Sequence, residues 1–526
     1  MARSKARVYT CCALMLLCVV AIIVCVVVLV RRKCPAGTFS KAAVAADSGR
    51  CSEIGRDILQ KGGSPVDGAI AALLCTSIMN PQSAGIGGGC IFTVMDSSGK
   101  VKIINSRETA PLKANPDLLK SCNKWIGVPG EIRGYAEAHR RYGKLPWATL
   151  FEPTIQLARE GFPIPYVQGL YIPYVDTSST QLLRKLYSDE NGNLLKIGDI
   201  VKFEKLADTL EMIAKQGPDV FYNGRIAEDL IRDIQQAGGT LTLQDLASYK
   251  VTVTDAWTVL LGDLILNIMK GYKMNSVPQT ADEKTSFYHR YIEAFKFANG
   301  LKKYIRDPKF SSDEMAKKFT EESFANHIRS LIRSDKAHDA QYYNLTSYVD
   351  SFSTTHVSVL AEDGSAVSVT SSINHIFGSK IFSPSTGIIL NNQLYDFCGR
   401  ADSISPGEQP PSSMAPVLLK SQSKTLVIGS SGGSMITTGM ASVCHLYLIH
   451  PSLEEAIDTP VVFVDSKNAV KFEPKFEKDV IEALEALGHN RQTTARFYNT
   501  VNAVEKEDGC VSAWSDERKK GKAAAY

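Results

Sequence analysis

The sequence predicts an α/β protein in which strands and helices are mixed along one long chain. Residues 353–360 and 366–373 alternate polar and apolar side chains, which is typical of half-buried strands. Residues 288–303 have the spacing of an amphipathic helix, and residues 66–78 predict an alanine-rich helix that is buried on most faces. With 526 residues, the chain is long enough to bury a large core.

An uncharged run at residues 8–30 predicts a transmembrane signal anchor. At roughly 1.5 Å per residue, this run can cross a bilayer core of about 30 Å. The alternative is a cleaved signal peptide, whose apolar region would be only about 7–15 residues long. Three basic residues stand on each side, so they do not orient the segment: Arg3, Lys5 and Arg7 before it, and Arg31, Arg32 and Lys33 after it.

Other features favour residues 1–7 as a cytoplasmic tail and residues 31–526 outside the plasma membrane, as in a single-pass type II protein. Asn344-Leu345-Thr346 is an N-glycosylation sequon, and Cys51 and Cys75 are a plausible disulfide among the 12 cysteines. No Cys-x-x-Cys or His/Cys metal spacing occurs, so we expect no metal and no cofactor. The 59 Lys and Arg nearly balance the 55 Asp and Glu, which does not indicate a nucleic-acid partner.

The amino-terminal third predicts helices, then a glycine-rich turn and two strands. Residues 41–80 indicate two helices, with Ser52 as a possible N-cap of the first. Gly85-Ile86-Gly87-Gly88-Gly89 could cradle an anion, but it lacks the Lys of a phosphate loop, so we interpret it as a turn where strands pass closely. Strands are predicted at residues 90–95 and 101–105. Arg107 follows them and is either a salt-bridge partner or a carboxylate clamp.

The middle of the chain is mainly helical, and it leads to the predicted strands at 353–373. Helices alternate with Gly/Pro breaks over residues 125–250, and Thr242 begins one of them. Residues 308–352 are charged and suggest an exposed approach, as a cleavable junction requires. Farther on, residues 426–434 predict a strand that enters a glycine-rich turn. That turn is either an oxyanion hole or a helix start capped by Ser434.

Asp363-Gly364 between two alternating runs predicts a β-hairpin. If these two residues form the turn, Glu362 pairs with Ser365 and Thr354 faces Ile373. Ser372 and Asn374 then stand on either side of Ile373, although a slip by one residue is possible. Taken alone, the hairpin indicates only an edge structure decorated with hydroxyl groups.

Together these segments resemble the gamma-glutamyltransferases (glutathione hydrolases), which are membrane-anchored N-terminal nucleophile hydrolases. The similarity runs from about residue 41 to the carboxyl terminus and is greatest to the type 5, gamma-glutamyl leukotrienase branch. It implies a four-layer αββα sandwich. The motifs that carry the resemblance are Ala43-Val44-Ala45-Ala46-Asp47, Gly85-Ile86-Gly87-Gly88-Gly89, Asn105-Ser106-Arg107-Glu108, Val128-Pro129-Gly130-Glu131, Thr354-x-His356-Val357-Ser358-Val359, Ser412-Ser413-Met414 and Gly432-Gly433.

The resemblance implies a precursor that cleaves itself between Ser353 and Thr354. The products would be a large chain, residues 31–353, and a small chain, residues 354–526, held together by packing. The Thr354 hydroxyl would be the nucleophile, and the freed α-amino group would be the base. An α-amine has a pKa of about 7.7–8.0, so it can accept the hydroxyl proton near neutral pH.

The resemblance also assigns roles to further residues. Glutathione and its S-conjugates, such as leukotriene C4, would be cleaved through a gamma-glutamyl-Thr354 acyl-enzyme, with transfer to water or to an acceptor amino acid or peptide. The implied roles are Arg107, Ser412 and Ser413 for the α-carboxylate, Gln393, Asp396 and Asn374 for the α-amino group, Ser372 for orienting the nucleophile, and the N–H groups of Gly432 and Gly433 for the oxyanion.

The sequence departs from the family pattern at three important places. Ser353 stands where Gly is usual before the nucleophile, and Gln393 replaces the Glu of many animal members. Relatives have roughly 17 more residues after Asp263, including a strand whose loss would expose backbone groups of a sheet. These departures support an alternative function, a catalytically silent surface protein that keeps the fold and remains uncleaved.

Overall fold

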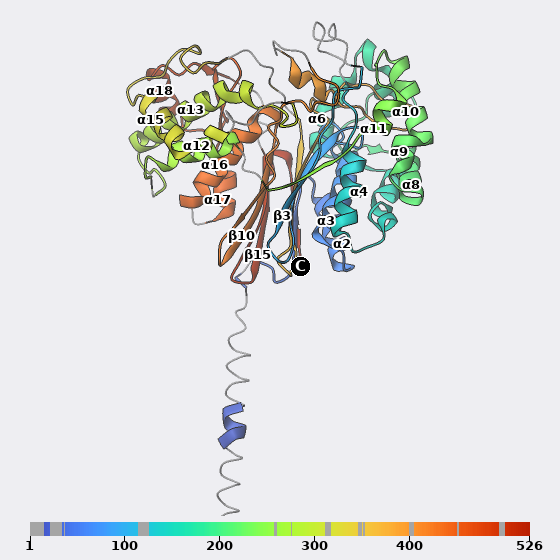
Figure 1. Ribbon diagram of the computed structural model, residues 1–526, viewed down its shortest axis with the longest axis horizontal. Helices are drawn as coiled ribbons and strands as arrows, with labels where there is room; N and C mark the ends of the chain where they lie inside the picture. The colour runs from blue at the N-terminus through green and yellow to red at the C-terminus, as the bar shows by residue number, and fades with distance from the viewer. Residues whose placement is uncertain are drawn as a thin grey trace, which may run out of the picture.

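The computed structural model places two β-sheets face to face, with a layer of helices on each outer side (Figure 1). It describes residues 15–20, 34–35, 37–113, 126–256, 260–274, 276–310, 317–345, 350, 353–398, 404–449, 452–493 and 500–526. Separate apolar clusters lie between each helical layer and its sheet and between the two sheets. The expected four-layer αββα sandwich is confirmed.

The first sheet has seven strands and is antiparallel throughout. In spatial order its strands are β16 (Ala524–Ala525), β1 (Ala43–Ala45), β7 (Thr355–Leu360), β8 (Ala366–Ser372), β2 (Gly89–Met95), β3 (Val101–Ser106) and β6 (Thr252–Asp255).

The second sheet has four antiparallel strands and packs against the first. Its strands are β15 (Cys510–Ser515), β14 (Thr500–Glu507), β10 (Lys424–Ser431) and β9 (Val417–Lys420). Shorter strands form two small sheets: β4 (Phe162–Pro163) with β5 (Ile200–Val201), and β11 (Val462–Val464) with β12 (Val470–Phe472) and β13 (Arg491–Gln492).

The helices divide between the two outer layers (Figure 1). Those on the side of the first sheet are α2 (Gly49–Gln60), α3 (Pro65–Met79), α4 (Glu131–Tyr142), α5 (Glu152–Glu160), α6 (Tyr166–Tyr171), α7 (Gln181–Leu186), α8 (Glu204–Gln216), α9 (Asp219–Asn223), α10 (Arg225–Gln236) and α11 (Leu243–Ser248). Those on the side of the second sheet are α12 (Leu260–Lys270), α13 (Ala281–Leu301), α15 (Glu322–Leu331), α16 (Ile436–Ile449), α17 (Leu453–Asp458) and α18 (Lys478–Ala486).

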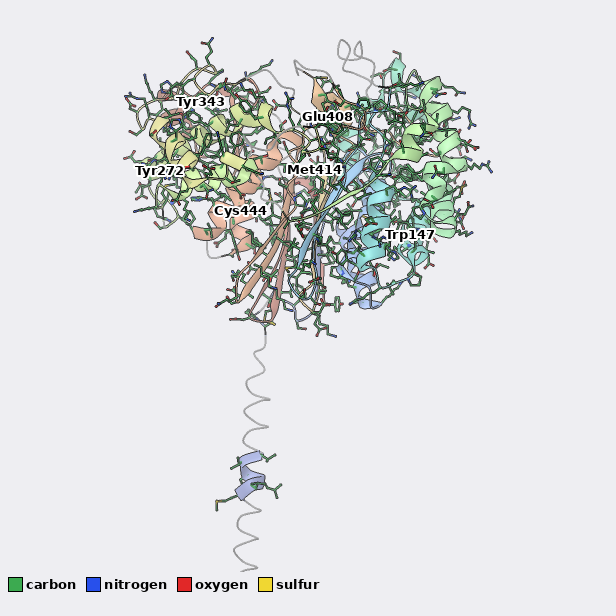
Figure 2. The ribbon with its side chains drawn as sticks, in the orientation of Figure 1. Trp147, Tyr272, Tyr343, Glu408, Met414 and Cys444 are labelled. Carbon is green, nitrogen blue, oxygen red and sulfur yellow. A yellow bond between two sulfur atoms is a disulfide. The ribbon has the colours of Figure 1, made fainter. Side chains whose placement is uncertain are left out.

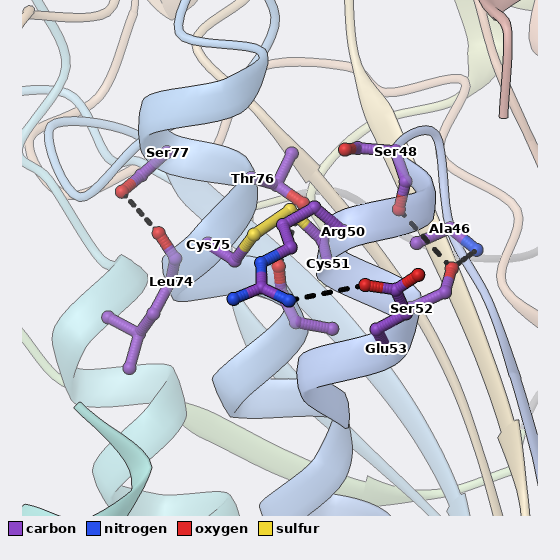
Figure 3. Close-up of a disulfide and its surroundings, with 11 residues drawn as sticks. Ala46, Ser48, Arg50, Cys51, Ser52, Glu53, Leu74, Cys75, Thr76 and Ser77 are labelled. Atoms are coloured by element: carbon purple, nitrogen blue, oxygen red, sulfur yellow. Dashed lines mark hydrogen bonds and ion pairs between the residues drawn. A yellow bond between two sulfur atoms is a disulfide. The ribbon is translucent and has the colours of Figure 1, made fainter. Parts of the chain in front are cut away.

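A capping side chain marks the start of α3 but not the start of α2. Ser64 and Asp67 form a reciprocal capping box at the start of α3, and every residue of that helix is buried. The prediction that Ser52 is the N-cap of α2 was wrong. Helix α2 begins at Gly49, three residues before Ser52, and Ser48 is its N-cap. Ser52 is buried inside the helix, where its hydroxyl accepts the Ala46 N–H and donates to the Ser48 carbonyl (Figure 3).

The sequence offered Cys51 and Cys75 as a disulfide pair, and these residues are bonded in the structure. The bond joins α2 to α3 (Figure 3). Helix α2 contacts β1 and β16 of the first sheet, and α3 contacts β7 and β8, so the bond fastens two neighbouring helices of this layer to each other.

The β7–β8 hairpin has a register one residue away from the predicted one. Leu360 pairs with Ala366 and Thr355 pairs with Ser371, so Thr354 stands opposite Ser372 instead of Ile373. The register differs from the predicted one because the hairpin loop has three residues, Glu362 to Gly364, and Gly364 has a φ of 80°. A glycine readily adopts this left-handed conformation, which closes three-residue hairpin loops.

The Gly85–Gly89 motif is a close backbone crossing, as the sequence suggested. A Cβ on Gly88 would collide with the carbonyl oxygen of Ser372 on β8, and a Cβ on Gly87 would collide with the carbonyl of Ile389. The Gly88 carbonyl also accepts the N–H groups of Gly130 and Glu131 at the start of α4. The motif therefore brings α4 and the end of β8 together.

The departure from the family pattern that the sequence predicted after Asp263 falls within a helix, because Asp263 lies inside α12. The chain passes from β6 to α12, and the described residues between these elements form no strand. Leu264, Ile265 and Ile268 of α12 are buried in the apolar cluster beside the second sheet. The helix that carries the departure is therefore packed into a core.

The predicted membrane segment falls almost wholly outside the described residues, as does the predicted cytoplasmic tail. Residues 15–20 are helical and exposed. Among the described residues, no helix combines the length and the apolar character needed to span a bilayer.

Gly88→Ala should destabilise the protein by about 1–3 kcal/mol, since overpacking a tight backbone crossing forces neighbouring strands apart. Urea or thermal denaturation measures this loss. Gly85→Ala in the same turn is the matched control, because its Cβ would find its nearest atom at 4.0 Å, on Ser77. Equal stability of the two variants would contradict the close-crossing interpretation.

Candidate functional site

Thr354 lies at the start of β7, where its side chain meets the end of β8. Its Oγ1 is 3.2 Å from Oγ of Ser372, and its residue is only 3% exposed. Its φ is 140°, a conformation that β-branched residues rarely adopt. Surrounding contacts must therefore hold the backbone of Thr354 in this strained position.

One of those contacts comes from Lys519, at the end of a short 3₁₀ turn (Glu517–Lys519) near the carboxyl terminus. Its Nζ donates to the Thr354 carbonyl oxygen at 2.6 Å, to Ser431 Oγ at 2.6 Å and to Asp47 Oδ2 at 2.9 Å. All three ammonium protons are thus used, and Lys519 is 3% exposed.

Asp47 completes this buried cluster from the end of β1. Besides Lys519, its carboxylate accepts the Thr355 hydroxyl at 2.9 Å and the Asn502 side-chain amide at 2.8 Å. Asn502 also donates to the His356 carbonyl at 2.8 Å, so the cluster links β1, β7 and β14. Asp47 is thereby paired with an opposite charge and fully hydrogen-bonded, as a buried carboxylate requires.

Sequence reasoning assigned no role to Lys519 or Asp47. Asp47 belongs to a motif that carried the family resemblance, but Lys519 lies in a charged carboxyl-terminal stretch that looks solvated. No local spacing relates positions 47, 354, 431 and 519, because they meet only through the packing of the two sheets.

Ser353, the residue before Thr354, is buried and well anchored. Its hydroxyl donates to the Gln82 carbonyl oxygen at 2.8 Å. The positive φ falls on Thr354 and not on Ser353. A serine can therefore take the place of the usual glycine at this junction without backbone strain of its own.

Arg107, directly after β3, is held by a loop and a carboxylate. Its Nε donates to the Pro410 carbonyl at 3.0 Å, and its Nη2 donates to Asp396 Oδ2 at 2.7 Å and to the Pro411 carbonyl at 2.8 Å. Among the described residues, its Nη1 contacts only Sδ of Met414, at 3.9 Å; Met414 lies between the two helical layers (Figure 2). Nη1 thus has no oxygen partner in the part of the chain that the structure describes.

Asp396 accepts hydrogen bonds from two other predicted site residues, Asn374 and Gln393. Asn374 Nδ2 donates to Oδ1 at 3.0 Å, and Gln393 Nε2 donates to Oδ2 at 2.8 Å. The buried Gln393 Oε1 has no hydrogen-bond partner among the described residues. A ligand with an N–H or ammonium group would satisfy this oxygen.

A continuous series of polar contacts connects Thr354 to Arg107. The Ser372 hydroxyl that meets Thr354 also accepts the Asn374 N–H at 2.9 Å. The Asn374 side chain then reaches Asp396, which pairs with Arg107. With Gln393, which donates to Asp396, five of the sequence-predicted residues thus stand in one connected site with the candidate nucleophile.

The remaining predicted residues lie on two neighbouring turns. Ser412 and Ser413 are half-buried on the loop whose carbonyls hold Arg107, and Ser412 Oγ accepts the Met414 N–H at 3.0 Å. Gly432 and Gly433 are buried directly after β10, with φ values of 120° and 60°. Ser431, the residue before Gly432, shares the Lys519 ammonium with Thr354, which brings this turn to the candidate nucleophile.

Glu108 is a second acidic side chain beside Arg107. Burial raises its pKa to about 8, although Arg107 opposes the shift. Neither of its carboxyl oxygens has a hydrogen-bond partner among the described residues. A neutral Glu108 at physiological pH leaves Asp396 as the anionic partner of Arg107.

Lys519→Met should destabilise the protein by about 3–5 kcal/mol, because it leaves the Asp47 carboxylate buried without its cation. Chemical denaturation of the full-length chain measures the loss. Lys520→Met is the matched control: Lys520 is exposed, so its replacement should change stability by less than about 0.5 kcal/mol. A similar small effect at both positions would contradict the bridging role of Lys519.

The sequence of the chain is similar to known proteins of one family. The family model described as "Gamma-glutamyltranspeptidase" matches residues 51–526. The glutathione hydrolase 5 proenzyme of Rattus norvegicus is 42% identical over 542 aligned residues, which cover 94% of each chain.

Solved structures share the fold. Cephalosporin acylase from Bacillus halodurans superposes with a TM-score of 0.81 at 24% identity, over 94% of this chain and 98% of that one. The gamma-glutamyltranspeptidase of Helicobacter pylori has a TM-score of 0.50 at 26% identity, over 56% of this chain and 92% of its own. The chain belongs to the gamma-glutamyltranspeptidase family, is an enzyme with the N-terminal nucleophile hydrolase fold of that family, and is similar to its type 5 glutathione hydrolases.

Proposed function

We propose that this enzyme cleaves gamma-glutamyl amide bonds of glutathione and glutathione S-conjugates through an acyl-enzyme on Thr354. The observation that carries this proposal is the connected series of contacts from Thr354 through Ser372, Asn374 and Asp396 to Arg107. It joins a candidate nucleophile to a pair of opposite charges. The relatives named glutathione hydrolase 5 support the substrate class.

The first step is hydrolysis of the chain's own peptide bond between Ser353 and Thr354. Addition of water yields a carboxylate on Ser353 and an α-amino group on Thr354, and so a large chain, 31–353, and a small chain, 354–526. The strained φ of Thr354 supports cleavage at this bond, because hydrolysis releases strain that neighbouring contacts impose. The word proenzyme in the relative's name agrees with such processing.

The charged pair Arg107–Asp396 suits the two charges on the gamma-glutamyl α-carbon. An α-carboxylate and an α-ammonium are attached to the same carbon, so their partners must also be adjacent. Arg107 and Asp396 are 2.7 Å apart. The carboxylate would take Nη1 of Arg107 with the help of Ser412 and Ser413.

The ammonium would lie near Asp396, with Asn374 beside it. Gln393 Oε1, which lacks a partner among the described residues, would accept one of its protons. This oxygen also explains how Gln can serve where many animal relatives have Glu, since the acceptor atom is retained and only a charge is lost. The two contacts fix which amide faces Thr354.

In the acyl-transfer cycle, the Thr354 hydroxyl oxygen attacks the gamma-carbonyl carbon while the α-amine of Thr354 takes the hydroxyl proton. The Gly432 and Gly433 N–H groups stabilise the oxyanion, and Ser372 orients the nucleophile. The proton passes to the leaving amine, such as cysteinylglycine. Water, or an acceptor amino acid or peptide, then takes the gamma-glutamyl group from the ester.

The buried Lys519 supports the α-amine as base. Its ammonium group donates to the carbonyl of the same residue, so a positive charge lies next to the amine formed on cleavage. A nearby cation disfavours protonation and lowers the pKa of that amine.

The compartment we propose is the cell surface, with residues 8–30 in the membrane and the enzyme outside, as a type II protein. The disulfides Cys51–Cys75 and Cys34–Cys510 support an oxidising compartment. Asn344 is exposed on a positive-φ turn, as a glycan acceptor should be; Thr346 of its sequon lies outside the described residues.

Thr354→Ala should abolish both processing and activity. On a reducing denaturing gel, the full-length wild-type chain should yield a fragment that begins at Thr354 by amino-terminal sequencing, and the variant should remain intact. Thr354→Ser is the control, since it retains a hydroxyl and should still process. An intact wild-type chain without gamma-glutamyl hydrolase activity would favour the catalytically silent alternative.

Arg107→Met should lower kcat/KM for a gamma-glutamyl anilide by about 10- to 100-fold, because a charged hydrogen bond contributes ~1.5–3 kcal/mol. An anilide donor without the α-carboxylate completes a double-mutant cycle. The variant should lose little further activity on that donor. Arg140→Met, which removes an exposed arginine, should leave both donors unaffected. Equal losses on both donors would show that Arg107 does not bind the carboxylate.

A further inference from the structure

A second disulfide joins parts of the chain that the proposed cleavage separates. Cys34 and Cys510 are bonded, with their Cα atoms 5.5 Å apart and 476 positions between them in sequence. Cys34 precedes the junction at 353/354, and Cys510 follows it. The Cys51–Cys75 bond, by contrast, lies entirely within the large chain.

Backbone pairing around this bond fixes its position. The Phe39 N–H donates to the Val511 carbonyl at 2.8 Å, and the Val511 N–H donates back to Phe39 at 2.8 Å, one residue from Cys510. Lys41 and Ala42 donate to the Tyr526 carbonyl, and the Tyr526 N–H donates to Ala42 at 3.1 Å. Cys34, Phe39, Lys41 and Ala42 are therefore each bonded to residues of the proposed small chain.

We propose that Cys34–Cys510 is an interchain disulfide that covalently joins the large and small chains of the mature enzyme. The proposal rests on the proposed cleavage at Thr354. It adds a covalent bond to an association that the sequence attributed to packing alone. Because Cys34 stands four positions after the apolar run at 8–30, the bond also ties the chain with the nucleophile to the segment nearest the proposed membrane anchor.

Formation of the bond converts two thiols into one disulfide and releases two protons and two electrons. A protein disulfide of the secretory pathway would be the oxidant, by thiol–disulfide exchange through a mixed disulfide, and would itself become a dithiol. The backbone pairs at Phe39 and Val511 would bring the two thiols together before oxidation.

The bond changes how the two chains dissociate. Without it, a small chain that separates is diluted and must find its partner by a bimolecular encounter. With it, the chains stay at an effective concentration that is typically millimolar for short connections. Re-association after partial unfolding then becomes independent of protein concentration.

Cys398 also lies in the small chain and is disulfide-bonded, so the experiment must separate its bond from the Cys34–Cys510 bond. The test therefore uses the full-length chain in detergent, alkylated before denaturation, in four forms: wild type, Cys398→Ser, Cys34→Ser/Cys510→Ser, and the triple variant. Cys51→Ser/Cys75→Ser is the matched control, since it removes a bond within one chain. Each form is run on denaturing gels with and without reductant.

Wild type and Cys398→Ser should give one full-size band without reductant and two bands with it. The triple variant should release the 354–526 chain without reductant. Non-reducing peptide mapping of wild type should find the Cys34 peptide linked to the Cys510 peptide. This map needs no variant, so it holds even if a substitution prevents folding.

Release of the small chain from Cys398→Ser without reductant, or a Cys34 peptide found alkylated or linked elsewhere, would overturn the proposal. A single band with reductant would instead show that cleavage fails, which overturns the proposed processing and with it the interchain role. In that case the peptide map would still report the pairing separately, so the two failures are distinguishable.

Discussion

The buried ammonium group of Lys519 is the contact on which the site depends. It ties together the end of β1 through Asp47, the start of β7 through the Thr354 carbonyl, and the end of β10 through Ser431. A lysine without solvent is tolerated only with a carboxylate and a complete set of acceptors, and both are present here. Its three bonds fix three strand ends from both sheets relative to one another. The strained backbone of Thr354 persists because its carbonyl is held in this way.

From that fixed point the polar contacts run across strand ends of the first sheet, from the start of β7 and the end of β8 to the end of β3. The Thr354 hydroxyl meets Ser372, and Asn374 leads on to Asp396 and Arg107. Each member is supported by a second partner, so the site is ordered before any donor binds. Glycines in the Gly85–Gly89 turn also support the site. Because they have no side chain, the turn can pass close to the backbone of Ser372.

The departures from the family pattern have physical accounts in the structure. Ser353 takes an unstrained backbone and a hydrogen bond to Gln82, so glycine is not required there. Asp263, where relatives are expected to have further residues, lies inside α12, and the buried face of this helix is packed in its core. The second sheet ends at β9, a four-residue strand that closes with Lys420, and short charged edges are those least prone to unwanted pairing.

The sequence by itself determined the periodic elements, the hairpin that carries Thr354, and the residues that resemble the family's donor site. Local patterns suffice for these, because capping boxes, alternation and glycine turns act over a few residues. The hairpin register was wrong by one residue, since loop geometry at Gly364 decides it. Only the tertiary structure brought Lys519 to Asp47 and Thr354, and Cys34 to Cys510. Those partners are separated by 165 to 476 positions, and only the stacking of the two sheets places them in contact.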